Sequence, residues 1–477
     1  MKSLVIYESP NKFKTFSSMF EGMDVSFCYT QGRIYDLPTN DYGINKKMEL
    51  TLVPINNERL AFIENKIAQH ELIYCLTDND PEGEWIASHI KEMAKDSKAK
   101  FLRVRVNELN KSSLEEGIVQ ASENLDRGLL SKAIVRRTID RTIGYYNNKK
   151  KEIKRGRVLT PIISDIHNNP TAPKATLILT DESGLQIKIE APTSSSDALK
   201  SELLDMKGEY KGIKSKDNVD LYSTGDLLKE RALFHDSKPE NVFEEIQHEY
   251  EIGNISYART PNKKYEVLGG EHKGIHALGK KIDIEDEGSF TDTVLDMIKL
   301  RTLIHMNPDK FSVSKYEPSN KLYSLCKKHD AEVKQISKVT TIPQSRYEIK
   351  RPVLLHARMS STPRKLTVQV FDHNKSYELL NRFEKLGIGE PSTLHSHAKK
   401  IRKLVTLDEV GFRLNSHGVR IAIQSDKLSM RLREPDFTRS MNELLDNNTL
   451  SIEIKSKKCL NVLRISDPTG SGLNLGS

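Results

Sequence analysis

The sequence is poor in cysteine and has no long apolar run. Only four cysteines occur in 477 residues, and no two are spaced as C-x-x-C: Cys28, Cys75, Cys326 and Cys459. A zinc ribbon is therefore not expected, and scattered cysteines are typical of a reducing compartment, so we predict a cytoplasmic location. No eighteen consecutive residues are apolar, and the N-terminal apolar run is too short for a secretory signal, so we expect no membrane span.

The sequence also lacks an internal repeat, a coiled-coil heptad and a G-x-x-x-x-G-K-[ST] loop. Hydrophobic residues make up 37% and charged residues 29%, which is typical of a soluble globular protein. The length suggests about three or four domains. The net charge of +8 is compatible with a nucleic-acid partner, although basic clusters at 147–157 and 397–403 are equally typical of solvated surfaces.

Strand and helix patterns alternate over the first hundred residues, which predicts a parallel sheet covered by helices. Short apolar runs at 3–7 and 71–77 predict strands, and Ser9-Pro10 predicts the start of a helix after the first of them. The later segments are predicted in order as helices over 110–168, strands over 174–191, an irregular polar segment to about 220, helices over 223–251, strands within 340–372 and helices over 375–405.

Carboxylates follow both predicted strands of the first hundred residues. Glu8 follows the first, and Asp78, Asp80 and Glu82 follow the second. Ligand sites in open α/β sheets gather at these strand ends, and several hard oxygens in one turn suit Mg²⁺. A calcium loop of the EF-hand type is excluded because His89 stands where the twelfth residue should be glutamate.

A surface turn that only caps the following helix is the alternative to a metal site. For an isolated D-x-D pattern this alternative is favoured. The nearby sequence ESPNK adds Glu8 and Lys12, which shifts the balance towards a metal site.

The stretch GNISYART places Tyr257 two residues before Arg259. In a strand, both side chains would share one face. Local composition alone favours an ordinary half-buried tyrosine, so any role as a nucleophile depends on the rest of the chain.

Motifs in the right order and spacing resemble those of type IA DNA topoisomerases, from residue 2 to about 420. These motifs are LVIYESPNKFKTF, GRIYDLP (32–38), TDNDPEGEWIA (77–87), VRRTIDRTIGYYNN (135–148), KRGRVLTPII (154–163), DLYSTGDLLKERA (220–232), GNISYART and GIGEPSTLHSHAKKI (387–401). One such motif is weak support, whereas an ordered series in one chain is strong.

The resemblance implies a multidomain α/β fold in which an N-terminal Toprim domain, with a Rossmann-like parallel sheet, joins helical and β-rich domains in a toroid of four domains. The implied boundaries are a Toprim domain (1–115), a helical domain (116–172 and 375–425), a β-rich domain (173–222 and 310–374), a catalytic tyrosine domain (223–309) and a C-terminal tail (426–477).

The resemblance also implies an enzyme that cuts one DNA strand, passes another through the gap and reseals it without ATP. Tyr257 would form a 5′-phosphotyrosine, Arg259 would stabilise the transition state, and Lys12 would hold the scissile phosphate. Glu8 would be the general acid. Asp78, Asp80 and Glu82, with Glu8, would hold Mg²⁺, and His272 would support the active-site hydrogen bonds.

Further positions would bind DNA, the expected partner, in a single-strand groove: Arg33, Arg136, Arg137, Asp140, Arg157, Ser392 and Thr393. For Ser392 and Thr393, capping of the next helix is an equally good interpretation.

The chain departs from the family pattern around the catalytic residues, which bears on reaction rate and metal dependence. Arg33 stands where a histidine is common, and Lys273, His276 and Pro261-Asn262 replace other usual residues. Two alternatives stay open: a catalytically impaired, single-stranded-DNA-binding accessory protein, and a Toprim nuclease. We expect a monomer.

Overall fold

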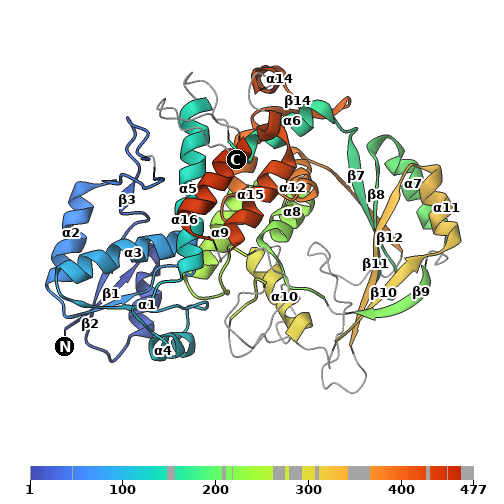
Figure 1. The fold of residues 1–477 in the computed structure, drawn as a ribbon. Coiled ribbons are helices and arrows are strands. Elements are labelled where there is room, and N and C mark those ends of the chain that lie inside the picture. The colour runs from blue at the N-terminus through green and yellow to red at the C-terminus, as the bar shows by residue number, and fades with distance from the viewer. Residues whose placement is uncertain are drawn as a thin grey trace. The chain divides into compact units, whose positions relative to one another are not determined.

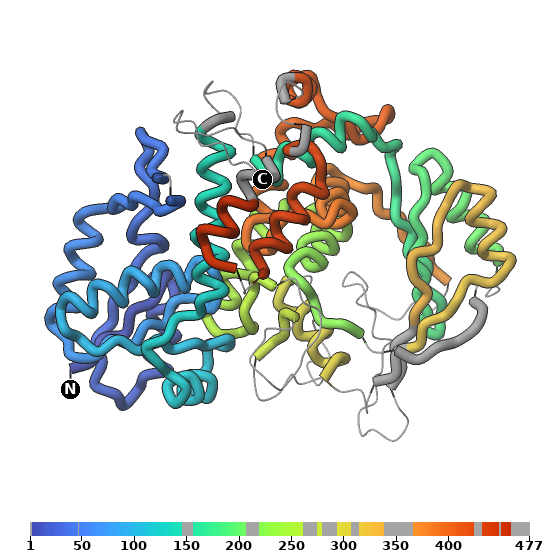
Figure 2. The backbone as a smooth tube through the Cα atoms, in the orientation of Figure 1, coloured from blue at the N-terminus to red at the C-terminus, as the bar shows by residue number. Residues whose placement is uncertain are grey.

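The structure is a computed structural model that describes residues 2–45, 47–147, 156–206, 211–217, 219–260, 274–278, 293–306, 311–341, 366–425, 430–447 and 450–463. The chain divides into two compact units. The first contains Met1–Ser164, Tyr250–Gly253 and Arg420–Ser477, and the second contains Asp165–Glu249 and Asn254–Val419. Figure 1 shows the elements and Figure 2 the course of the backbone.

A four-stranded parallel sheet forms the centre of the first unit (Figure 1). Its strands, in spatial order, are β2 (Val25–Tyr29), β1 (Ser3–Tyr7), β5 (Leu72–Cys75) and β6 (Lys100–Arg103). Each neighbouring pair is parallel. The predicted strands at 3–7 and 71–77 and the parallel sheet are therefore confirmed.

Helices cover both faces of this sheet. Alternate residues of β1 point to opposite sides and contact different helices. Leu4 and Ile6 share a buried core with α2 (Asn57–Ala68) and α3 (Pro81–Asp96). Tyr7 packs on the other side against Phe16 of α1 (Phe13–Met19), with ring centroids 5.1 Å apart. A short 3₁₀ turn (Pro10–Lys12) precedes α1 and has Ser9 as its N-cap, which confirms the predicted helix start.

The remaining elements of the first unit are mainly helices. They are the strand pair β3 (Tyr35–Asp36) and β4 (Val53–Pro54), the helices α4 (Lys111–Val119), α5 (Arg127–Asn147), α15 (Pro435–Asp446) and α16 (Ile452–Leu463), and the 3₁₀ turn η2 (Met430–Arg433). Helix α5 packs against α15 through Val135, Ile139, Phe437 and Met441. Helices α6 (Leu159–Asn168) and α14 (Ser416–Ser425) each span a boundary between the units.

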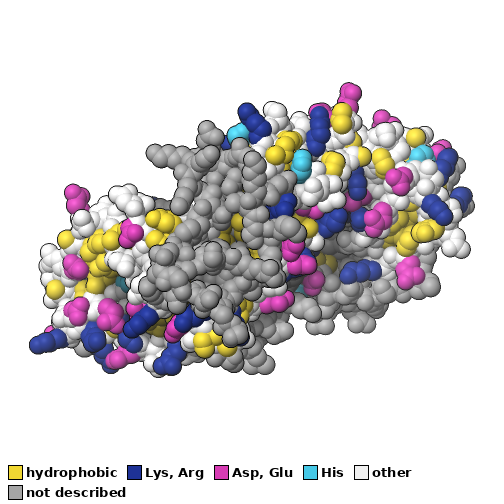
Figure 3. Space-filling model, turned by 45° about the horizontal axis from the view of Figure 1, so that its top comes forward, with side chains coloured by type: hydrophobic (Ala, Val, Ile, Leu, Met, Phe, Trp, Pro, Cys, Tyr) yellow, Lys and Arg dark blue, Asp and Glu magenta, His cyan; other side chains and the backbone are white. Residues whose placement is uncertain are grey.

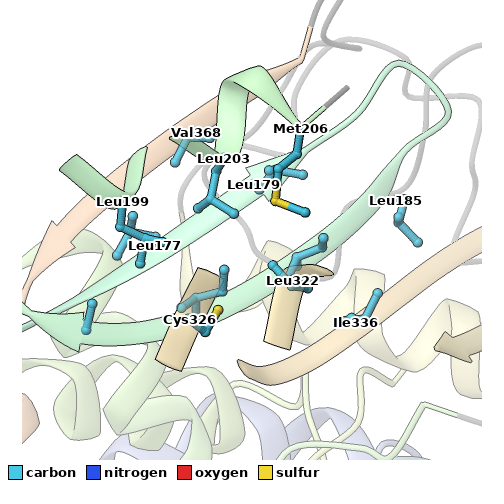
Figure 4. Close-up of a cluster of buried hydrophobic side chains, with 13 residues drawn as sticks. Leu177, Leu179, Leu185, Leu199, Leu203, Met206, Leu322, Cys326, Ile336 and Val368 are labelled. Carbon is cyan, nitrogen blue, oxygen red and sulfur yellow. The ribbon is translucent and has the colours of Figure 1, made fainter. Parts of the chain in front are cut away.

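A six-stranded antiparallel sheet dominates the second unit. Its strands, in spatial order, are β12 (Thr367–Asp372), β7 (Lys174–Thr180), β8 (Leu185–Pro192), β11 (Glu332–Thr341), β10 (Phe311–Pro318) and β9 (Lys211–Asp217). Leu177, Ile187 and Ile336 point from one face into a core with α7 (Thr193–Asp205) and α11 (Asn320–Lys328), which Figure 4 shows in close-up.

The prediction of an irregular segment between the strands and residue 220 is wrong, because this segment contains α7 and β9. Serines and threonines dominate the start of α7, which is typical of loops. Leu199 and Leu203 nevertheless lie one turn apart and are both fully buried against the sheet, so tertiary packing stabilises the helix.

Helices and one hairpin complete the second unit. They are α8 (Thr224–His235), α9 (Pro239–Glu251, whose last two residues belong to the first unit), α10 (Val294–Met306), α12 (Lys375–Leu386), α13 (Leu394–Arg402), β13 (Val405–Asp408) and β14 (Gly411–Leu414). The helices predicted over 223–251 and 375–405 are confirmed, whereas the segment 342–365 lies outside the described residues. None of the helices in the described ranges is long and apolar enough to cross a membrane.

Candidate active site

The turn between β5 and α3 carries the predicted metal ligands Asp78, Asp80 and Glu82. Asp80 is the N-cap of α3, and its side chain accepts the N–H of Gly83 at 2.8 Å. A Cβ on Gly83 would lie 2.0 Å from the carbonyl oxygen of Asp78, so only glycine allows the chain to approach itself here. The cap and this close approach together define the acidic turn, residues 78–84.

A buried arginine of β6 holds the same turn from the other side. The Arg103 guanidinium donates hydrogen bonds to the carbonyl oxygens of Thr77 at 2.8 Å and Asp78 at 3.0 Å. Its Nε donates to Glu84 at 2.8 Å, and neither charged side chain has any exposed surface. Sequence reasoning missed Arg103 and Glu84, because their pairing across 19 residues leaves no local pattern.

Lys12 is buried beside the acidic turn, with 1% of its surface exposed. Its ammonium forms an ion pair with Asp78 and lies 4.7 Å from the ring centroid of Tyr250. Burial alone would lower the pKa of Lys12, but the negative charges of Asp78 and Glu8 raise it overall, so Lys12 stays charged. Lys12 and Asp78 are thus close together, as the predicted roles require.

Glu82 is held by Arg33 from the segment between β2 and β3. Arg33 Nε and Nη2 donate to the two carboxylate oxygens of Glu82, the second at 2.8 Å. Arg33 Nη1 also donates to Asp36 at 3.2 Å, and Asp36 accepts two further bonds from Arg137 at 2.7 and 3.0 Å. Burial would raise the pKa of Asp36, but the bonds from Arg137 and Arg33 lower it overall.

Glu8 directly follows β1, and β1 pairs with β5, the strand that leads into the acidic turn. Its charge contributes to the raised pKa of Lys12, so its carboxylate lies within electrostatic reach of that ammonium. Asn11 and Thr15, from the same loop and helix, bond to Glu251 at 2.9 and 2.7 Å. Sequence reasoning missed Tyr250 and Glu251, which belong to the first unit although the segment Asp165–Glu249 separates them from Ser164.

Tyr257 belongs to the second unit and is 4% exposed. Its segment is not a regular strand, because within the described residues it forms an isolated bridge, between Ile255 and Ala277, instead of a strand ladder. The hydroxyl of Thr224, in the first turn of α8, donates to the carbonyl of Ala258 at 2.7 Å. The same hydroxyl accepts the N–H of Thr260 at 3.1 Å.

The backbone N–H of Thr224 also donates to the carbonyl of Thr260, at 3.0 Å. The segment from Tyr257 to Thr260 is therefore held by one residue of α8 and not by a strand ladder. Sequence reasoning placed DLYSTGDLL before the catalytic domain but missed this contact.

Arg259 is half-buried near His395 of α13. The His395 ring stacks on Phe243, with centroids 3.8 Å apart and an interplanar angle of 13°. Burial, and secondly the positive charge of Arg259, lower the pKa of His395 to about 4. An uncharged imidazole thus lies next to the arginine that follows Tyr257.

His272 lies outside the described residues, as do Pro261, Asn262 and Lys273. His276 is described and is 8% exposed. Its backbone pairs with Ser256, the residue before Tyr257: Ser256 N–H donates to the His276 carbonyl at 2.9 Å, and His276 N–H donates to the Ser256 hydroxyl at 3.1 Å. His276 therefore supports the backbone beside Tyr257.

Comparison with known proteins places this arrangement in context. Residues 3–109 match the model of the Toprim domain. The chain is 33% identical over 151 residues to DNA topoisomerase 1 of Campylobacter jejuni, which covers 30% of this chain and 21% of the relative. It is 24% identical over 319 residues to the plasmid DNA topoisomerase I of Xylella fastidiosa, which covers 59% of this chain and 47% of the relative.

A solved structure, that of full-length topoisomerase I from Thermotoga maritima, matches 96% of this chain and 89% of its own with a TM-score of 0.64. At 17% sequence identity this likeness shows the fold. The chain is thus similar to type IA DNA topoisomerases, in sequence over part of its length and in fold over almost all of it. It spans less than half the length of the two curated relatives that it matches.

In this topoisomerase-like protein, three of the predicted DNA-binding arginines make internal ion pairs, of which those of Arg33 with Glu82 and Asp36 are described above. Arg137 binds Asp36, and Arg157, which is 5% exposed, donates to Asp140 at 2.8 Å and to Asn442 at 3.0 Å. Arg136 precedes Arg137 on α5 and is half-buried. On the face shown in Figure 3, basic and acidic side chains are interspersed across the described surface.

The predicted contacts from GEPST lie at the start of α13. Thr393 is the N-cap of this helix, and its hydroxyl donates to the Glu390 carbonyl at 3.4 Å without a capping bond to the helix. Ser392 precedes it and is half-buried. Thr393 thus takes the capping position without the capping hydrogen bond.

The donor atoms of the topoisomerase-like chain fit Mg²⁺ by type and by place. Glu8, Asp78, Asp80 and Glu82 all follow the carboxyl ends of neighbouring strands. Within the described ranges, however, no three Asp, Glu, His or Cys side chains form a group that could hold a metal ion. Lys12 and Arg33 already hold Asp78 and Glu82, so a metal ion would have to compete with them.

Proposed function

We propose that this chain is a type IA DNA topoisomerase, which cuts one DNA strand, passes another through the break and reseals it without ATP. Its topological task would be relaxation of negatively supercoiled DNA or decatenation through single-stranded regions. The observation that carries the proposal is the segment that contains Tyr257 and Arg259, which Thr224 of α8 holds through hydrogen bonds to Ala258 and Thr260. The fold of the chain matches that of a topoisomerase over 96% of its length.

In the proposed reaction, Tyr257 gives up its phenolic proton to solvent, and the resulting phenolate oxygen attacks the phosphorus of a DNA phosphodiester. A bond from tyrosine to the 5′ phosphate forms while the bond to the 3′ oxygen breaks. Glu8 donates a proton to the departing 3′ oxygen, and Arg259 offsets the negative charge that builds up on the phosphate. In resealing, the 3′ hydroxyl attacks the phosphotyrosine and returns its proton to Glu8.

Lys12 would contact the scissile phosphate. In the structure its ammonium is bound to Asp78, so phosphate contact requires Lys12 to share or leave that carboxylate. Toprim domains in general bind Mg²⁺, and here Asp78 and Asp80, with Glu82 and Glu8, would hold it. The ion would position the 3′ end for resealing and neutralise phosphate charge. His272 would complete the hydrogen bonds around the tyrosine.

Single-stranded DNA would approach Tyr257 along the predicted groove residues Arg136, Arg137, Asp140 and Arg157, with Ser392 and Thr393 as phosphate contacts. Because two of the arginines already bind carboxylates, their neighbours Asp36 and Asp140 would keep them oriented. Phosphate neutralisation makes such binding dependent on salt and tolerant of sequence.

Trapping of a covalent adduct tests the proposal. The protein is incubated with labelled single-stranded DNA, denatured, and examined for label attached to protein. We expect an adduct from the unaltered chain, none from Tyr257→Phe, and an adduct from Tyr323→Phe, a matched change at a tyrosine on α11 that is 62% exposed.

Absence of an adduct from the unaltered chain would overturn the proposal. DNA binding without cleavage would then identify an accessory single-strand-binding protein, and cleavage without an adduct would identify a Toprim nuclease. An adduct that persists in Tyr257→Phe would overturn the assignment of the nucleophile.

A further inference from the structure

Arg33 binds the carboxylate of Glu82, one of the predicted metal ligands, through two hydrogen bonds. Its Nε and Nη2 reach the two carboxylate oxygens of Glu82, so both acceptor atoms that a metal ion would use carry a guanidinium N–H. The two side chains are 29% and 31% exposed, which leaves the pair accessible to ions from solvent. A metal ion can use Glu82 only if Arg33 gives way.

Two further contacts keep Arg33 in this place. Its third nitrogen donates to Asp36, which Arg137 also binds. Its guanidinium lies over the ring of Trp85, 5.0 Å from the centroid, and Trp85 is itself 3% exposed. A flat guanidinium between two carboxylates and an indole loses little freedom when it binds, so Arg33 is oriented for Glu82 in advance.

We propose that Arg33 is a built-in cation that occupies Glu82 and thereby sets the affinity of the acidic turn for divalent metal ions. The proposal deepens the proposed function, on which it rests for the class of ion. A metal ion that binds the turn either displaces Arg33 from Glu82 or binds without this carboxylate. Both routes weaken binding relative to a turn in which Glu82 carries no arginine.

The proposal differs from a purely structural role for Arg33 in what it predicts for Glu82. If Arg33 neutralises Glu82, removal of the carboxylate costs less metal affinity in the unaltered protein than it does once Arg33 is gone. Removal of Arg33 alone then strengthens metal binding. A structural staple predicts the opposite sign, because Arg33→Gln would loosen the turn and weaken metal binding.

Binding of Mn²⁺, measured by electron paramagnetic resonance of the free ion, and of Mg²⁺, measured by calorimetry, tests this in the full chain without DNA. We expect Arg33→Gln to tighten binding about three- to tenfold, because the pair is partly exposed and its coupling is at the low end of the usual range. Arg33→Lys keeps the positive charge but loses the paired N–H groups of the guanidinium, so its metal affinity should lie between those of the unaltered protein and Arg33→Gln. Arg127→Gln, at an exposed arginine in the first turn of α5, is the charge-matched control and should change affinity less than twofold.

The double-mutant cycle completes the test. Glu82→Gln should cost less affinity in the unaltered protein than in the Arg33→Gln background, where it should abolish the gain. Equal affinity of the unaltered and Arg33→Gln proteins would overturn the proposal, as would an equal loss on Glu82→Gln in both backgrounds, or no divalent binding by any of the proteins. Far-ultraviolet circular dichroism confirms that each variant is folded.

These outcomes are separate from the test of function. The adduct experiment depends on Tyr257 and is read from DNA attached to protein, whereas metal affinity is read without DNA. A failed cycle with a normal adduct therefore overturns only the role of Arg33.

Discussion

Arg103 and Glu84 form an ion pair at 2.8 Å in which both side chains have no exposed surface. Arg105 adds a second, partly exposed partner to Glu84 at 3.1 Å. Buried charges of this kind are stable only together, because loss of one leaves the other charge without compensation in a low-dielectric interior. The pair also fixes the carbonyl groups of the acidic turn, so its loss should affect both stability and the metal ligands.

Substitution of Arg103 by alanine should therefore lower the free energy of unfolding by about 3–5 kcal/mol. Urea unfolding followed by the fluorescence of the single tryptophan, Trp85, measures the change in the unit that contains it. Lys95→Ala is the control, because its pair with Glu92 is long (3.9 Å) and exposed. The control should lose about 0.5 kcal/mol or less, and an equal loss in both variants would contradict the expectation.

Gly83→Ala should deform the acidic turn. The added Cβ would lie 2.0 Å from the backbone oxygen of Asp78, and backbone atoms cannot swing away as a side chain can. We expect a loss of about 2 kcal/mol or more in unfolding free energy, measured by urea unfolding. Gly156→Ala meets nothing within 4 Å and should be neutral or slightly stabilising. An unchanged stability of Gly83→Ala would show that the turn can relax.

Thr224→Val should slow adduct formation by Tyr257 about tenfold or more, because it removes the hydrogen bonds of the hydroxyl that fix the segment from Ala258 to Thr260. Stability should fall by only about 1–2 kcal/mol. The rate of adduct formation on labelled single-stranded DNA is the measurement. Thr224→Ser keeps the hydroxyl and should restore most of the rate. If valine and serine act alike, the hydroxyl does not position the tyrosine.

His89 should make the first unit sensitive to acid. Burial lowers its pKa to about 4 from the ordinary 6.5, because the imidazole lies against the rings of Tyr35 and Trp85. Between pH 6.5 and 4 the unfolded chain binds a proton that the folded chain does not, so stability is full above pH 6.5 and falls as the pH drops. The contribution lost by pH 4 is about 3 kcal/mol.

Urea unfolding at pH 7, 5.5 and 4.5 measures this dependence for the unaltered protein and for His89→Phe. The variant cannot take up the proton in either state, so its stability should fall less steeply over the same range. Identical slopes for the two proteins would assign the acid sensitivity to other groups.

Local signals explain what the sequence predicted correctly. The run SLVIY, the cap at Ser9 and the turn at Asp80-Pro81 each act within a few residues, and each appears as expected in β1, the first 3₁₀ turn and α3. The same locality explains the failure at α7, where a serine-rich start hides a helix that Leu199 and Leu203 stabilise from the sheet.

Contacts between distant residues explain what sequence reasoning missed. Lys12 and Asp78 are 66 residues apart, and Thr224 and Ala258 are 34 apart. Motif order predicted that such residues belong to one reaction but not which atoms meet. The pairing of Arg33 with Glu82, 49 residues away, is of the same kind. The toroid and the domain boundaries stay predictions, and the role of Tyr257 is a prediction that the adduct experiment addresses.

Lys12 and Arg33, which bind the acidic turn, also bear on how DNA would reach it in the proposed reaction. A bare group of carboxylates would repel a polyanion, and the repulsion would act before any contact formed. Lys12 on Asp78 and Arg33 on Glu82 cancel half of the negative charge of the four predicted ligands in advance. In the proposed reaction, a DNA backbone would therefore meet a partly neutralised site even before a metal ion binds.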